Sequence, residues 1–203
     1  MNDSREVIDA IIRRRPAARV GVHDSPWGDT LRLWLTQGMP ADKKGNPVDV
    51  TEHFGFDMAR AGGWFDFLPK IGVSEVIEET AEWKITRNGA GAVLKHWKNK
   101  SGTPEHIDFA MTSREIWDRD YRPRLVGPFD RARLPDLNIT RERMARQKQQ
   151  GLWTFYGQLF IWEIMRCSMG DYVMYMSLID DPEWVHDFAR VYMDLFKKGF
   201  GIY

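Results

Sequence analysis

The sequence predicts an α/β protein, and three observations lead to that prediction. Predicted strands and helices alternate along the 203 residues, without an internal repeat or a low-complexity linker, and this order suits an α/β domain better than a helical bundle. Residues 152–156 are continuously apolar and Gly157 follows them, which is typical of a strand buried on both faces that ends in a sharp turn. Several amphipathic segments carry helix start and stop signals.

In the N-terminal third, the pattern predicts a helix, a strand and a second helix. Ser4 is the predicted N-cap of a helix whose apolar positions 7, 8, 11 and 12 share one face. Residues 20–22 are short, apolar and β-branched, so we expect a first inner strand there. A helix over 29–36 follows. We expect residues 20–22 and 152–156 to be parallel strands that end on the same side of the sheet.

The middle of the chain departs from this order. Apolar positions alternate over residues 73–98, including Trp83, Ile85 and Val93, on both sides of the turn signal Asn88-Gly89. This pattern predicts an antiparallel hairpin. Such a hairpin is an excursion from a parallel core, because parallel strands are joined by crossover connections rather than by tight turns.

The remaining segments are predicted to be mostly helical. A capping box at 112–115 opens a helix that Pro123 limits, and Asn138 or Thr140 opens another that runs to Gln150. A helix over 161–169 and a separate segment over 171–179 precede Asp181, the predicted cap of a long helix with Pro182 in its first turn. Residues 200–203 begin a further apolar segment, so we expect the chain to be the N-terminal part of a longer protein.

The composition excludes several classes of protein. Hydrophobic residues make up 43% and charged residues 29% of the chain, as in an ordinary globular protein. Twenty-nine basic and twenty-nine acidic residues cancel, and without a basic stripe a nucleic-acid partner is not expected. The single cysteine, Cys167, excludes an internal disulfide. The N-terminus lacks a secretory signal and no apolar run is long enough for a membrane span, which predicts a cytoplasmic protein.

Three stretches resemble the uroporphyrinogen decarboxylase superfamily. These are GLWTFYGQLFIWE at 151–163, MGDY at 169–172 and LIDDPEWV at 178–185. Upstream, EHFGFD at 52–57 and KNKSGTP at 98–104 are similar to divergent members that are called decarboxylase-like. The resemblance covers nearly the whole chain, and its most specific features are the Asp-Pro-Glu helix start and the turn at Gly157.

The resemblance implies a (β/α)8 barrel of the TIM type that binds substrate at its strand ends. A complete barrel takes roughly 250 residues, so residues 1–203 would be a single domain forming its N-terminal part, with the 73–98 hairpin inserted outside it. Two activities are implied: decarboxylation of a porphyrinogen, and zinc-dependent methyl transfer between a corrinoid protein and an acceptor. The substrate would be a tetrapyrrole or a methyl-group donor, and the zinc ligands would lie in a C-terminal half that follows this chain.

Two departures from the family pattern favour methyl transfer over decarboxylation. Residues 23–32 read HDSPWGDTLR where decarboxylases carry paired arginines that grip propionates, and the segment that contacts the pyrrole nitrogens has only GGWFD at 62–66 as its nearest match. Decarboxylation in porphyrin biosynthesis is the alternative, and a non-catalytic binding module is the alternative of another class. A reading frame that continues past Tyr203 with a late histidine and two cysteines would support methyl transfer, whereas a natural stop would support the module.

We predict Asp66 and His23 as catalytic residues. His23 follows the predicted first strand, where active sites of barrels collect, and Asp66 lies between Phe65 and Phe67, a position suited to proton donation or a pyrrole contact. The predicted substrate-binding residues are Asp24, Arg32, Trp64, Trp162 and Glu163. The alternatives are a loop histidine with Asp24 in a turn, a strand-edge aspartate bonded to backbone, and a helix that places Trp162 in the core and Glu163 at the surface.

No metal ligands are predicted within the chain. The five histidines and Cys167 lack the spacing of a zinc site. A half barrel also leaves strand edges and apolar helix faces uncovered. We therefore expect residues 1–203 alone neither to bind zinc tightly nor to turn over substrate.

Overall fold

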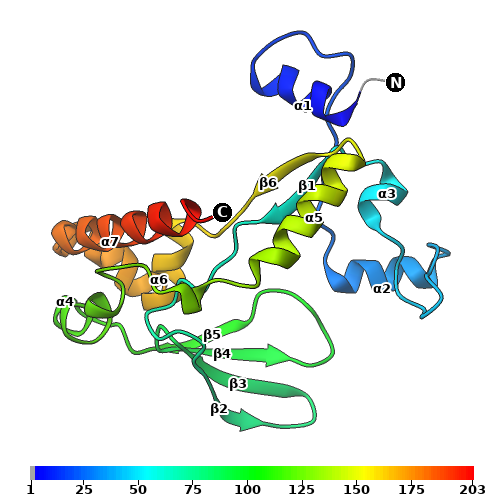
Figure 1. The fold of residues 1–203 in the computed structure, drawn as a ribbon. Coiled ribbons are helices and arrows are strands. Elements are labelled where there is room, and N and C mark those ends of the chain that lie inside the picture. Colours follow the sequence, from blue (N-terminus) through cyan, green and yellow to red (C-terminus); the bar gives the residue numbers. More distant parts are fainter. Residues whose placement is uncertain (1–2) are drawn as a thin grey trace. The chain divides into compact units, whose positions relative to one another are not determined.

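The computed structural model describes residues 3–203, which form two compact units (Figure 1). Unit 1 joins the chain up to Gly63 with Asp136–Gly157, and unit 2 joins Trp64–Pro135 with Gln158–Tyr203. Both helices and strands are present, with parallel strands in one unit and antiparallel strands in the other, so the chain is a mixed α/β protein. Neither sheet of the described residues closes into a barrel.

Unit 1 is built around a two-stranded parallel sheet. Its strands are β1 (Met58–Gly62) and β6 (Trp153–Tyr156), and its helices are α1 (Ser4–Ile12), α2 (Gly28–Thr36), α3 (Val50–Phe54) and α5 (Leu137–Gln149). Met58 lies opposite Trp153 and Arg60 lies opposite Phe155. Helix α5 directly precedes β6 and packs on both strands (Figure 1). A helix before the second of two parallel strands is the arrangement of a crossover connection.

Residues 20–22 do not form the predicted strand. Val20 is 81% exposed, and β6 pairs with β1 instead. The Asp57 amide donates to the Val22 carbonyl at 2.8 Å, and the Asp57 carbonyl accepts from the Trp153 amide at 2.9 Å. The Val22 amide donates to the Asp57 side chain rather than to a strand. Residues 20–22 therefore flank the start of β1 without forming a ladder, and the prediction of a parallel pair 20–22 with 152–156 is wrong.

The fully buried carboxylate of Asp57 ties three segments of unit 1 together. Its two oxygens accept bonds from both terminal nitrogens of Arg19, at 2.5 and 2.6 Å, and from the Ser4 hydroxyl at 2.6 Å. Ser4 is therefore not the N-cap of α1. Asp3 is the cap instead, because its carboxylate accepts the Arg5 amide. We call Asp57, Arg19, Ser4 and Val22 the Asp57 cluster.

Unit 2 contains a four-stranded antiparallel meander. Its strands are β2 (Ser74–Glu79), β3 (Trp83–Asn88), β4 (Ala92–Trp97) and β5 (Glu105–Phe109), in that order (Figure 1). The predicted hairpin is confirmed, since β3 pairs with β4 across a turn in which the Asn88 carbonyl accepts the Gly91 amide. The Asn88 side chain accepts the amides of Ala90 and Ala92 as well. Strands β2 and β5 extend the hairpin on both sides.

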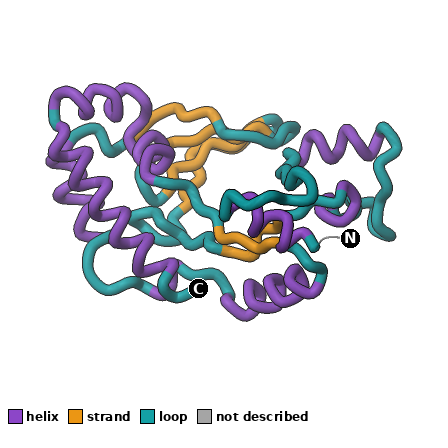
Figure 2. The backbone as a smooth tube through the Cα atoms, turned by 90° about the horizontal axis from the view of Figure 1, so that it is seen from above, coloured by secondary structure: helices purple, strands orange, loops and turns teal. Residues whose placement is uncertain are grey.

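The two longest helices of unit 2 are α6 (Ile161–Asp180) and α7 (Pro182–Phe200), which pack against each other (Figures 1 and 2). The predicted division of α6 is confirmed, because Gly170 has φ of 78° and interrupts the helix. Asp181 caps α7 by accepting the Trp184 amide at 3.1 Å, as predicted. Phe200 ends α7 and a turn follows, so the apolar residues 200–203 do not begin a strand.

Shorter helical turns complete unit 2. They are α4 (Arg114–Ile116), the π-helical turn η1 (Trp117–Tyr121) and the 3-10 turns η2 (Arg122–Arg124) and η3 (Arg131–Arg133). Ser113 caps α4, one residue after Thr112, the first residue of the predicted capping box. In unit 1 the cap of α5 is Asp136, because its carboxylate accepts the Asn138 amide, and neither Asn138 nor Thr140 serves.

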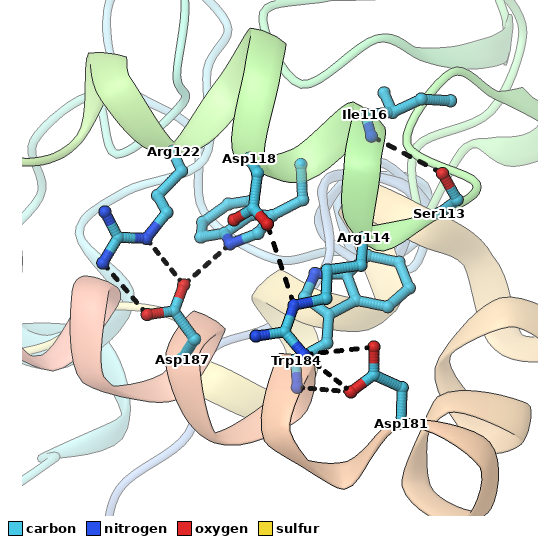
Figure 3. Close-up of polar contacts among 9 residues, drawn as sticks. Ser113, Arg114, Ile116, Asp118, Arg122, Asp181, Trp184 and Asp187 are labelled. Carbon is cyan, nitrogen blue, oxygen red and sulfur yellow. Dashed lines mark hydrogen bonds and ion pairs between the residues drawn. The ribbon is translucent and has the colours of Figure 1, made fainter.

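An aromatic core holds unit 2 together. Trp117 is fully buried, with its ring centroid 4.8 Å from that of Phe188, which in turn lies 4.6 Å from Tyr192. A carboxylate on α7 anchors this core to η1 and η2, because Asp187 accepts the Trp117 indole N–H at 2.9 Å and two bonds from Arg122 (Figure 3). Arg122 lowers the pKa of Asp187 by these hydrogen bonds.

Candidate functional site at the ends of β1 and β6

The parallel sheet of unit 1 has one face toward α5 and one face that carries a cation. Ala59 and Ala61 are buried, whereas Arg60 between them is exposed. Side chains alternate between the faces of a strand. Tyr156 lies on the α5 side, since its hydroxyl is 3.8 Å from the Met144 sulfur on α5. Arg60 therefore lies on the face turned away from α5.

An aromatic side chain and a histidine share this face with Arg60. Phe155 lies opposite Arg60 in the parallel register, and residues in register point to the same face. The His23 ring meets Phe155 edge to face, with 5.4 Å between centroids, and lies 6.3 Å from Phe56. His23 and Arg60 therefore both lie beside Phe155, and the Arg60 guanidinium reaches Gly157, the residue that follows β6.

Two glycines allow the chain to pass close to Arg60 and β6. At Gly157 a Cβ atom would lie 2.6 Å from an Arg60 terminal nitrogen, so the glycine makes room for the guanidinium. Gly63 has φ of +91°, and a Cβ there would lie 2.6 Å from the Tyr156 Cβ. Strand β1 has an irregularity between Arg60 and Gly62, just before this close approach. The backbone thus brings both strand ends together beside the Arg60 side chain.

The Arg60 guanidinium has no carboxylate partner within residues 3–203. Its backbone carbonyl accepts the Gln147 side chain at 3.2 Å, and the guanidinium packs over Gly157. A guanidinium offers a planar fork of donors that matches carboxylate and phosphate oxygens. The imidazole of His23 can add a further donor. This face is therefore suited to bind one anionic group of a substrate, with Phe155 as an apolar surface beside it.

Three predicted site residues lie in unit 1, and only His23 is part of this face. Asp24 is exposed and its carboxylate accepts the next amide, that of Ser25, at 2.6 Å. This bond is typical of a turn residue, which was the alternative to a substrate-binding role for Asp24. Arg32 forms an ion pair with Asp29 on α2, so its charge is already compensated.

Asp66, the other predicted catalytic residue, lies in unit 2 and organises a loop. Its carboxylate oxygens accept the amides of Leu68 at 2.9 Å and Gly72 at 2.7 Å. Its own amide donates to the Arg133 carbonyl at 2.8 Å. These bonds are those of the alternative, a backbone-bonded aspartate, although the residue lies in a loop and not in a strand.

The remaining predicted residues of unit 2 are dispersed. Trp64 is 49% exposed and its ring contacts Phe67, while its carbonyl accepts the Tyr203 hydroxyl. Trp162 is also 49% exposed, with its ring near that of Tyr175, so the alternative that placed it in the core is wrong. Glu163 pairs with Arg166 at 3.0 Å. Each of these three side chains therefore contacts a residue that is not among the predicted site residues.

Cys167 and the histidines do not form a metal centre. Burial raises the pKa of the half-buried Cys167 thiol, which disfavours the thiolate that binds zinc. Within residues 3–203 no three His, Cys, Asp or Glu side chains lie close enough to hold a metal ion. The side chains of residues 3–203 therefore do not by themselves provide a zinc site.

Arg60 is the functional candidate that the sequence analysis missed. Met-Ala-Arg-Ala-Gly carries few strong strand formers, so nothing local marks it as a strand. The available signal was a single arginine between two small apolar residues, followed by Gly62-Gly63.

Comparisons with known proteins add no relative. The chain matches no protein-family model, and neither the curated proteins nor the solved structures contain a significant match. In the part of the chain that the structure describes, no helix has the length and apolar composition needed to cross a bilayer.

Proposed function

We propose that the chain belongs to a cytoplasmic methyltransferase built on a (β/α)8 barrel of the uroporphyrinogen decarboxylase type. The face of unit 1 that carries Arg60, Phe155 and His23, which we call the Arg60 face, forms one wall of its substrate pocket. The observation that carries this proposal is the position of Arg60. It is a cation in the middle of β1 without a carboxylate partner among the described residues, on the face away from the covering helix, and its guanidinium lies beside Gly157, just past the carboxyl end of β6. Active sites of barrels lie at that end of the strands.

The arrangement of unit 1 supports the barrel. Asp57, just before β1, is hydrogen-bonded to Val22 on one side and to Trp153 of β6 on the other, so the three segments are neighbours in the order in which they occur in the chain. Helix α5 covers one face of β1 and β6. A barrel has the same order of neighbouring segments and the same placement of helices outside the strands. Its inner face would be the one that carries Arg60, Phe155 and His23.

The small number of cations available on the face that carries Arg60 favours methyl transfer over decarboxylation. A porphyrinogen carries several carboxylates, and Arg32, the only arginine of the 23–32 segment, is occupied by Asp29. Arg60 alone suits an acceptor with one anionic group. In the proposed reaction a thiolate acceptor forms a bond to the methyl carbon of a methylated corrinoid, and the electron pair of the cobalt–carbon bond stays on the corrinoid. Arg60 would bind and orient the anionic end of the acceptor.

The test compares two thiol acceptors with the product of the complete native reading frame. Demethylation of methylcobalamin is followed by absorbance with 3-mercaptopropionate, which is anionic, and 2-mercaptoethanol, which is neutral. We expect a preference for the anionic thiol that Arg60→Gln reduces about tenfold, the cost of losing one charged hydrogen bond. Arg32→Gln is the matched control and should keep the preference.

Equal rates with both thiols in the unchanged protein would contradict the role of Arg60. Consumption of uroporphyrinogen without methyl transfer would replace the proposed reaction by decarboxylation. Absence of both activities, in folded protein, would favour a binding module.

A further inference from the structure

A second cationic site lies in unit 2, away from the residues used above. A pocket of about 300 Å³ there is lined by apolar residues and by four charged ones, Lys70, Arg124, Asp130 and Arg133. Pockets of roughly this volume and above accommodate small molecules. Three of the lining side chains are basic and one is acidic, so the pocket has a formal charge of about +2 at neutral pH.

Arg133 is the unusual member of this pocket because it is only 4% exposed. Its guanidinium donates to the carbonyls of Asp66, Leu68 and Arg124, at 2.8 to 3.0 Å. Each acceptor is a neutral carbonyl. Among residues 3–203 it has no carboxylate within ion-pair distance, and burial lowers its pKa. A buried charge without a counter-ion is costly.

The nearest acidic side chains do not neutralise Arg133. The Asp66 carboxylate accepts the amides of Leu68 and Gly72, and the Asp130 carboxylate accepts the Ala132 amide. Both aspartates attract Arg133 only through space. The positive charge inside the pocket is therefore only partly offset by the protein.

The other two cations are also without ion pairs in the described structure. Lys70 is exposed, with its ammonium 5.9 Å from the centroid of the Tyr121 ring. Arg124 is exposed and donates to the Asp120 carbonyl at 3.0 Å. The Asp120 carboxylate, whose field reaches both cations, is paired with Arg119. Lys70 and Arg124 are thus available to a ligand.

We propose that this pocket binds a small molecule through a phosphate group. A phosphate dianion matches the pocket charge of +2, and its oxygens accept hydrogen bonds from guanidinium and ammonium groups. A purely structural role for Arg133, holding three loop carbonyls, would explain its hydrogen bonds. Such a role would not explain why Lys70 and Arg124, two cations without ion pairs among the described residues, line the same pocket. The proposal is independent of the Arg60 face and of the proposed methyl transfer.

The test is a titration of the 203-residue chain with inorganic phosphate, followed by amide and side-chain NMR shifts at constant ionic strength. We expect saturable shifts confined to residues 66–72 and 124–133. Lys70→Gln and Arg124→Gln should each weaken binding about tenfold, because each removes a charge-assisted hydrogen bond. The matched control is Lys100→Gln, since Lys100 lies over Trp97 in the same unit and outside the pocket.

Acetate at the same ionic strength distinguishes a phosphate site from general attraction of anions. Acetate should not displace phosphate at equal concentration. Non-saturable shifts, equal weakening by Lys100→Gln, or displacement by acetate would overturn the proposal. Lys70 and Arg124 are exposed, so these variants remain informative even if substitution of the buried Arg133 prevents folding.

Discussion

The two units are stabilised by different kinds of interaction. Unit 2 buries a continuous cluster of aromatic and aliphatic side chains that includes Trp117, Phe188 and Tyr192. Unit 1 buries few large side chains, and its segments meet at the fully buried Asp57 carboxylate. Apolar burial depends on area and not on pH, whereas a buried carboxylate depends on its partners and on its ionisation. The units should therefore respond differently to substitution and to acid.

The largest expected effect is in unit 2. Trp117→Ala removes a fully buried indole and its bond to Asp187, so we expect the free energy of unfolding of this unit to fall by about 3–5 kcal/mol. Urea unfolding followed by near-ultraviolet circular dichroism measures it. Trp162→Ala, at a half-exposed position, is the control and should change stability far less. A loss below 1 kcal/mol for Trp117→Ala would show that the aromatic cluster does not hold the unit.

A smaller effect is expected from the Asp57 cluster of unit 1. Asp57→Asn keeps the shape and removes the charge, so we expect a loss of about 1.5–3 kcal/mol, the range for hydrogen bonds to charged groups. Hydrogen exchange of the β1 amides reports on unit 1 directly. The control is Asp9→Asn, which breaks exposed ion pairs with Arg13 and Arg15 and should leave exchange unchanged. Equal exchange of the β1 amides in both variants would show that the Asp57 carboxylate does not stabilise unit 1.

Acid should weaken unit 1 through the same carboxylate. The hydrogen bonds from Arg19, together with those from Ser4 and Val22, hold the pKa of Asp57 far below that of an ordinary aspartate. The unfolded chain, with a pKa of about 3.9, therefore takes up the proton first as the pH falls. The contribution of Asp57 is complete above about pH 5 and is lost progressively below about pH 4.

The measurement is β1 amide exchange and the urea midpoint from pH 3 to pH 7. The Asp57→Asn variant should show a flatter profile than the unchanged chain. A parallel profile in the two proteins would show that another group controls the acid response. Asp187 in unit 2 also has a lowered pKa, but the aromatic core should retain structure there at a pH where unit 1 has opened.

The smallest expected effect distinguishes the two glycines at the strand ends. Gly157→Ala meets only the flexible end of Arg60, so we expect a change below about 1 kcal/mol and a displaced guanidinium. Gly63→Ala meets the Gly157 backbone nitrogen at 2.9 Å and has φ of +91°, so it should cost more, about 1–3 kcal/mol. Thermal unfolding compares the variants, and the reverse order would show that Arg60 is rigidly fixed.

Local chemistry in the sequence determined much of this protein. The helix over 4–12, the Asp181 cap and the Asn88-Gly89 turn were all predictable, because each depends on bonds between residues close in the chain. The predicted N-caps Ser4, Asn138 and Thr140 each lie one or more residues after the true N-cap of their helix. There a preceding aspartate accepts the first free amides instead.

Tertiary structure decided which segments became strands and which side chains meet. Residues 20–22 have the better strand composition, yet residues 58–62 pair with β6, because strand formation depends on a partner and on burial more than on intrinsic preference. The Asp57 cluster joins residues up to 53 positions apart, and Arg60 and His23 flank Phe155 from three distant segments. No local pattern encodes such contacts, since they exist only once the chain has packed.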